Sequence, residues 1–204
     1  MDANVISACF LTNDRATEII PYGSGLINRT YLVHCERSET FLLQQINHNV
    51  FKDVESLMNN IGLVTTYIKH HHPDKRTLEI LSTTTNKLYA STNEGYFRAY
   101  KFIDNSTSLD LVSDPHDMYI CGKGFGEFFA MLADFNASLL KETIPNFHNT
   151  ESRYNDFLLA AVNDKCGRYN KVKAEVEFVN NRCNNISLVR IYQFNQMFAA
   201  CSSC

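Results

Sequence analysis

Apolar, β-branched and aromatic residues gather in three short stretches near the start of the chain, separated by polar or glycine-containing turns, a pattern typical of β-strands. The stretches cover residues 17–22, 30–35 and 40–46. A turn with two glycines joins the first two, and the polar turn 36–39 joins the last two. This order predicts a three-stranded antiparallel meander.

One helix is predicted after the third strand, because apolar residues recur at spacings of three and four until Pro73 ends the pattern. The apolar positions are Val54, Leu57, Met58, Ile61, Val64 and Ile68. Three histidines, His70 to His72, close this helix. Cations suit the negative end of a helix dipole, so a solvated helix end is favoured over a metal site. Strand character returns in 77–82, 87–91 and 95–103.

The polar stretch 104–115 is the candidate boundary in the chain. Two helical stripes follow it, and residues 175–179 suggest a third helix. The class predicted is therefore α+β, with domains 1–103 and 104–187 and an atypical tail, 188–204. The first stripe contains Phe125, Phe128, Phe129, Leu132, Phe135 and Leu139, and the second contains Tyr154, Phe157, Leu158, Ala161 and Val162.

Composition narrows the classes of partner. The chain has 204 residues, 45% of them hydrophobic, which is enough for a globular core. The net charge is −3 without a basic block, so neither a nucleic acid nor a membrane surface is an expected partner. No signal peptide or membrane-spanning run is present in the sequence, and we expect a soluble, cytoplasmic protein.

The seven cysteines are scattered and odd in number, which favours free thiols. Cys201 and Cys204 have the spacing of a redox or metal pair. A second pair is lacking, so no metal site is predicted from them.

The first turn carries candidate chemistry in Gly23, Ser24 and Gly25. Glycines between two strands let backbone N–H groups approach a phosphate closely. A Rossmann fingerprint or a P-loop would need a helix directly after the glycines, and here a strand follows. A two-glycine turn also serves many hairpins for conformational reasons alone, and that alternative stays open.

Five blocks, in order, resemble the aminoglycoside phosphotransferase and choline kinase-like superfamily. The resemblance covers residues 19–187 and is closer to the N-acetylhexosamine 1-kinase type of sugar kinase. It implies a protein-kinase-like small lobe before a helical lobe, with ATP as the nucleotide, Mg²⁺ as the metal and an amino sugar as the acceptor. The blocks are GSGLINRTYLV, FLLQQINHNVFKDVESLMNNIGLVT, FRAYKFID, FGEFFAMLADF and ETIPNFHNTESRYNDF.

The resemblance also implies site residues. Gln44 or Gln45 takes the place of the strand lysine that grips phosphates in kinases, and which of them faces the cleft is open. Glu55 matches the acidic partner of that lysine, although a solvated carboxylate at a helix start is an equal alternative. The nucleotide loop is matched by Gly23, Ser24, Gly25 and Asn28, and the adenine-binding hinge by Tyr100, Lys101, Phe102 and Ile103. A buried strand and its exit over residues 98–103 is the alternative for the hinge.

His148 and Arg153 lie in a block that the resemblance places near the sugar. They could meet the substrate. A helix cap around residues 149–152 with a surface arginine is the favoured alternative.

The family's catalytic Asp, its Asn partner and the Asp on magnesium have no match. His72 to Asp74 (HPD) has Glu79 where the Asn should stand, and Asp134 (ADFN) is assigned to the solvent side of a helix. The ending RIYQFNQMFAACSSC resembles nothing in the family. We therefore expect a truncated chain or a pseudoenzyme that is catalytically inactive by itself. Its apolar helix stripes would lack their usual cover, so we expect marginal stability or self-association. A non-catalytic nucleotide-binding or interaction module is the alternative.

Overall fold

The computed structural model describes residues 6–11, 13–106, 111–112 and 114–186. The chain divides into two compact units, Met1–Ile144 and Pro145–Cys204. The first unit contains an antiparallel sheet and helices, and the second is helical in its described part. The predicted α+β class is confirmed. The order of strands and helix in the first unit is that of a protein-kinase-like small lobe.

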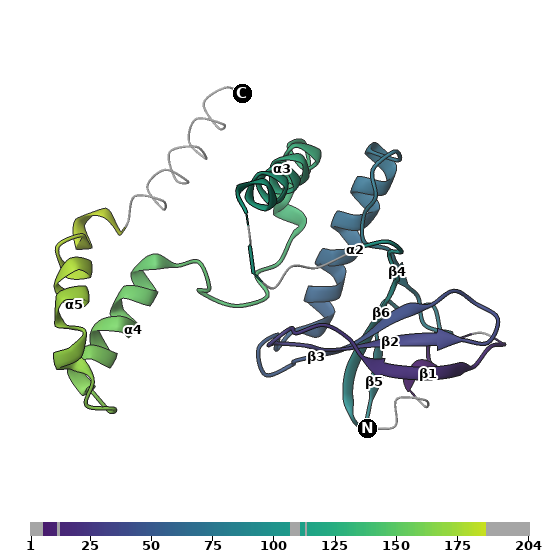
Figure 1. Cartoon of the computed structure of the whole chain (residues 1–204), viewed down its shortest axis with the longest axis horizontal. Coiled ribbons are helices and arrows are strands. Elements are labelled where there is room, and N and C mark those ends of the chain that lie inside the picture. Colours follow the sequence, from purple (N-terminus) through teal and green to yellow (C-terminus); the bar gives the residue numbers. More distant parts are fainter. Residues whose placement is uncertain (1–5, 12, 107–110, 113, 187–204) are drawn as a thin grey trace. The chain divides into compact units, whose positions relative to one another are not determined.

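The sheet of the first unit has six strands, all paired antiparallel, in the order β1-β2-β3-β6-β4, with β5 paired to β6 (Figure 1). The predicted meander of β1, β2 and β3 is confirmed. The strands are β1 (Ala16–Pro21), β2 (Arg29–Cys35), β3 (Phe41–Ile46), β4 (Ile80–Leu81), β5 (Ala90–Thr92) and β6 (Gly95–Lys101).

The connection between β4 and β5 is longer than the alternation predicts. Lys87 stands at the start of a predicted strand, yet its N–H donates to the Thr83 Oγ1 and its carbonyl accepts from the Thr83 N–H. This local turn uses the backbone groups that a strand would offer to its neighbour. As a result β5 begins at Ala90.

The two faces of the sheet pack against different segments. On one face, Leu43 and Phe97 join a buried cluster with Ile6 and Phe10 from the N-terminal segment. On the other face, Ile46 packs against Leu57 and Met58 of α2 (Val54–His71). We call this second face the helix face. Successive strand residues point to opposite faces, so each position on β3 can be assigned to one of them.

The predicted helix is α2, and its apolar stripe faces the sheet as expected. Asp53 caps its start, because the side chain accepts hydrogen bonds from the N–H and hydroxyl of Ser56. His70 and His71 are exposed at its end, as the solvated-end prediction required, whereas His72 is half-buried and its Nε2 lies 3.1 Å from the Met131 carbonyl oxygen. Glu55 is exposed in the first turn and likewise behaves as a solvated helix-start carboxylate.

The first helical stripe after the boundary is shorter than predicted. Helix α3 (Pro115–Met131) ends before Leu132, so the expectation of one helix through Phe135 and Leu139 is wrong. Short-range bonds from the backbone tighten the chain after Met131, and Asn136 caps a separate 3₁₀ turn, Ala137–Leu139. The Phe135 ring packs edge-on against Tyr67, with 5.1 Å between ring centroids.

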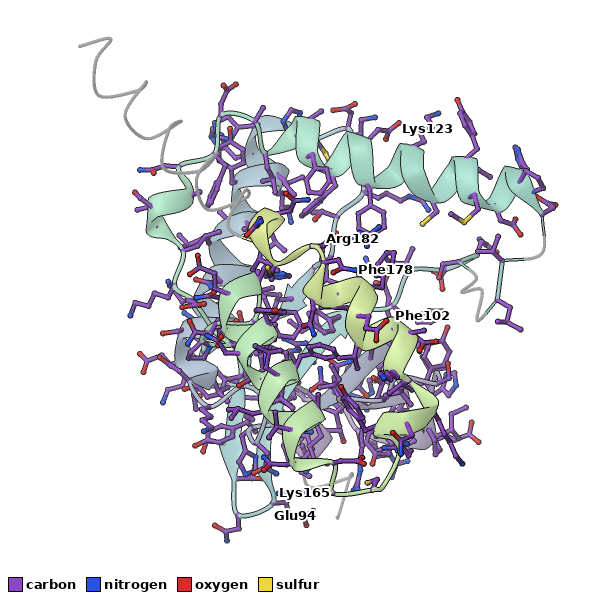
Figure 2. The ribbon with its side chains drawn as sticks, turned by 90° about the vertical axis from the view of Figure 1, so that its left-hand side faces the viewer. Glu94, Phe102, Lys123, Lys165, Phe178 and Arg182 are labelled. Carbon is purple, nitrogen blue, oxygen red and sulfur yellow. The ribbon has the colours of Figure 1, made fainter. Side chains whose placement is uncertain are left out.

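The second unit contains α4 (Thr150–Asn163) and α5 (Lys173–Asn180), with 3₁₀ turns at Tyr169–Lys171 and Cys183–Asn185. Both predicted helices are confirmed. After α4 the chain turns at Asp164, whose φ is 34° and whose carboxylate accepts from two backbone N–H groups. At the end of α5, the Arg182 guanidinium lies 3.4 Å from the centroid of the Phe178 ring (Figure 2).

Candidate functional site

Two rows of side chains cross the helix face of the sheet. The register of the strands aligns Tyr22, Thr30, Gln44 and Arg98, which we call the polar row; Tyr22 joins β2 through a hydrogen bond from its N–H to the Thr30 carbonyl. The neighbouring positions along the same strands form the apolar row, Ile20, Leu32, Leu42 and Tyr100. The apolar row, in which Leu32 and Tyr100 are buried and Ile20 is 39% exposed, therefore lies directly beside a row of hydrogen-bonding groups.

The structure separates the two glutamines that the sequence leaves equivalent. Gln44 lies on the helix face, where its Nε2 donates to the Thr30 Oγ1 at 2.8 Å. Gln45 points to the opposite face, and its Nε2 donates to the Glu94 carbonyl at 2.9 Å. Of the two glutamines, Gln44 is therefore the one that shares the helix face with α2.

Arg98 is the member of this face that sequence reasoning missed. It is only 9% exposed, and its Nε and Nη2 donate to the Gln44 Oε1 at 3.0 and 2.7 Å. Its Nη1 lies 3.7 Å from the Met58 sulfur on α2, and its guanidinium lies 5.2 Å from the centroid of the Tyr100 ring. Burial lowers the pKa of Arg98 and raises the pKa of Tyr100 to about 12.

One signal for Arg98 was present in the sequence. A charged residue stands in the middle of GYFRAYKFI, a stretch that otherwise reads as a buried strand. Charged side chains are seldom buried unless they are paired or bind something, so such a position marks a candidate site. Its partner on β3 is 54 residues away in the sequence and follows only from the register.

The glycine loop connects β1 to β2 over residues 22–28 and projects into solvent. Gly23 has a φ of 77°, which side chains other than hydrogen seldom allow, and there is open space where its Cβ would be. Leu26 is fully exposed. The Asn28 Oδ1 accepts from the Asn47 N–H at 2.9 Å, which ties the loop to the end of β3.

The predicted hinge, Tyr100 to Ile103, leaves the sheet at the end of β6. The Phe102 ring packs edge-on against Tyr22, with 5.8 Å between centroids, so the hinge meets the start of the glycine loop. The Lys101 N–H donates to the Glu79 carbonyl and its Nζ pairs with Glu39 at 2.7 Å. The Lys101 backbone donor is therefore already used by the sheet.

His148 and Arg153 belong to the second unit and are both exposed. The Asn149 side chain accepts from the Ser152 N–H at 3.1 Å and caps α4. Arg153 pairs with Asp156 at 3.6 Å along the helix surface. The favoured interpretation of this segment, a helix cap with a surface arginine, is confirmed, and a role in substrate binding stays a prediction.

A hollow of about 570 Å³ adjoins the hinge. Charges of both signs line it, among them Lys69, Glu79 and Asp104. The second unit has an apolar hollow of about 560 Å³ beside α4, lined by Phe157, Tyr169 and Val176. The lining of these two hollows includes no residue of the glycine loop or of the polar row.

Across the described ranges, no three His, Cys, Asp or Glu side chains gather as a metal site. Cys201 and Cys204 lie outside the described residues. In the part of the chain that the structure describes, each helix is too short or too polar to cross a membrane.

No protein-family model matches the sequence. Among solved structures, the chain is similar to a spectinomycin phosphotransferase determined in complex with ADP and spectinomycin, at 18% sequence identity and a TM-score of 0.40. The similarity covers 68% of this chain and 41% of that protein, so the chain spans about two fifths of its length. The assignment of the site rests on the geometry of the sheet.

Proposed function

We propose that the first unit binds ATP as the nucleotide lobe of a kinase-type phosphotransferase. The observation that carries this proposal is the pair of adjacent rows on the helix face. An adenine ring fits the apolar row beside the hinge, and phosphates fit the polar row below the glycine loop, where Gln44 and the loop N–H groups can donate. In this proposal residues 1–103 form the nucleotide lobe and 104–187 begin the helical lobe.

We further propose an N-acetylhexosamine as the acceptor, from the resemblance of the sequence blocks. Phosphate transfer on a kinase scaffold needs an Asp to orient the acceptor and a metal-binding Asn five residues later. No Asp in this sequence is followed by Asn at that spacing. The 204-residue chain is therefore proposed to bind nucleotide without transferring phosphate by itself.

A non-catalytic nucleotide-binding module is the second candidate function. The observation that favours it is the neutral Gln44 in the place of the kinase lysine, since an amide gives a hydrogen bond but no charge. Both candidates require nucleotide binding. They are separated by whether a partner polypeptide carrying an Asp-x₄-Asn segment restores transfer to the amino sugar.

Nucleotide binding is tested by titrating the full chain with ATP and ADP in a calorimeter, comparing Gly23→Ala with Gly167→Ala. Both glycines have positive φ, 77° and 62°, and at both an added methyl group would meet no atom within 4 Å, so the two substitutions strain the backbone alike. Only Gly23 lies in the loop. We expect weaker nucleotide binding for Gly23→Ala and unchanged binding for Gly167→Ala; equal affinities for both variants would contradict the proposed site.

A further inference from the structure

Arg98 presents a charge that the fold itself does not neutralise. In the described part of the chain, no carboxylate lies within ion-pair distance of its guanidinium, although the residue is 9% exposed. Its hydrogen-bond partners are an amide oxygen and a thioether. A buried charge without a counter-ion is costly, and its retention in a strand interior points to an anion that is supplied from outside.

The hydrogen bonds of Arg98 also determine how Gln44 is oriented. A guanidinium only donates, so the two bonds at 3.0 and 2.7 Å require the amide oxygen of Gln44 to face Arg98. The amide nitrogen must then face away, toward Thr30. That nitrogen carries two hydrogens, and the bond to the Thr30 hydroxyl uses one of them. The second N–H can donate to a ligand above the polar row.

We propose that Arg98 is the positioning residue of the phosphate site: it holds the Gln44 amide with its N–H toward the phosphates and places a positive charge behind that amide. Kinases carry a lysine on the third strand. Here the positive charge would come from Arg98 on the neighbouring strand, β6, at the position paired with Gln44. This inference rests on the proposed nucleotide site and names what recognises the phosphates there.

The test measures the dissociation constants of adenosine, ADP and inorganic tripolyphosphate for the full chain. The ratio of the adenosine constant to the ADP constant reports what the phosphates contribute. We expect Arg98→Met to reduce this ratio about tenfold or more, because hydrogen bonds to charged groups contribute about 1.5–3 kcal/mol. Adenosine affinity should fall by a smaller factor than ADP affinity, through the contact of Arg98 with the Tyr100 ring.

Two variants serve as controls. Arg182→Met removes the same charge from an exposed arginine that follows α5 and should leave the ratio unchanged. The double variant Gln44→Lys with Arg98→Met returns a cation to β3, opposite the vacated position. We expect the double variant to regain most of the phosphate contribution, which a purely structural role of Arg98 would not produce.

The outcomes separate this inference from the proposed function. If Arg98→Met weakens the binding of adenosine and ADP by the same factor, so that the ratio is unchanged, Arg98 does not position a phosphate site. The proposed nucleotide-binding function is not contradicted by that result. If tripolyphosphate binds through Arg98 while adenosine does not bind, the phosphate site stands and the nucleotide function fails. If the wild-type chain binds neither adenosine nor tripolyphosphate, both are wrong.

Discussion

Leu42 and Leu43 are adjacent on β3 and should respond in opposite ways to truncation. Leu43 is fully buried in the cluster with Phe97 and the N-terminal segment, on the face away from α2. Leu42 lies on the helix face, in the apolar row opposite Tyr100, and is half-buried. Leu43→Ala should therefore reduce stability alone, whereas Leu42→Ala should reduce stability less and should also weaken adenosine binding.

The magnitudes follow from burial. Deleting the side chain of a fully buried leucine typically costs about 3 kcal/mol, because the transfer term and the residual cavity add. In a unit of this size that corresponds to a fall of roughly 10 °C in the midpoint of thermal unfolding. Leu42→Ala should cost about half as much. Loss of the contact between the Leu42 side chain and an adenine ring should weaken adenosine binding by about tenfold.

The two variants are compared by thermal unfolding, followed by circular dichroism, and by adenosine titration at a temperature where both are folded. Each variant is the control for the other, since the substitution and the strand are the same. If Leu43→Ala weakens adenosine binding at such a temperature and Leu42→Ala does not, the nucleotide is bound on the other face and both rows are wrongly assigned.

Three further predictions concern charge, association and transfer. Hydrogen bonds from the Ser38 hydroxyl and neighbouring backbone N–H groups lower the pKa of Asp14 from 3.8 to about 2. The contribution of the ionised Asp14 carboxylate to the free energy of unfolding is therefore present above pH 3.8 and is lost as the pH falls to about 2. Asp14→Asn should make acid unfolding over that range less steep. Phe125 and Phe129 are 61% and 67% exposed on α3. We therefore expect concentration-dependent association in analytical ultracentrifugation, and we expect the double variant Phe125→Glu with Phe129→Glu to abolish it. A wild-type chain that is monomeric at all concentrations would refute this. The 204-residue chain should show no ATP-dependent phosphorylation of N-acetylhexosamines, and measurable turnover would refute that expectation.

Local patterns were sufficient to predict most of the elements. Short apolar, β-branched stretches between turns predicted the meander, and the spacing of Val54 to Ile68 predicted α2, because one side of that helix is apolar and packs on the sheet. The pattern failed after Met131, where apolar residues keep helical spacing although the helix has ended. Phe135 is apolar because it packs against Tyr67, so its position satisfies a tertiary contact rather than a helical period.

The nucleotide-binding roles of the glycine loop and the hinge stay predictions. The sequence could delimit both segments because each is a continuous stretch. The choice between Gln44 and Gln45 could not be made, since alternation shows only that they face opposite sides and does not show which side carries α2. Arg98 was missed for a related reason: its partner is set by pairing between β3 and β6, which no local pattern reports.

The polar row forms in only one register of the strands. Its members come from four segments that only the pairing of β1, β2, β3 and β6 aligns. A slip of one residue between β3 and β6 would place Phe97 opposite Gln44 and send Arg98 to the face occupied by Leu43 and the N-terminal segment. A buried guanidinium there would lie among apolar side chains without an acceptor. The bond between Arg98 and Gln44 thus penalises the wrong register, and the same bond orients the amide of the proposed phosphate site.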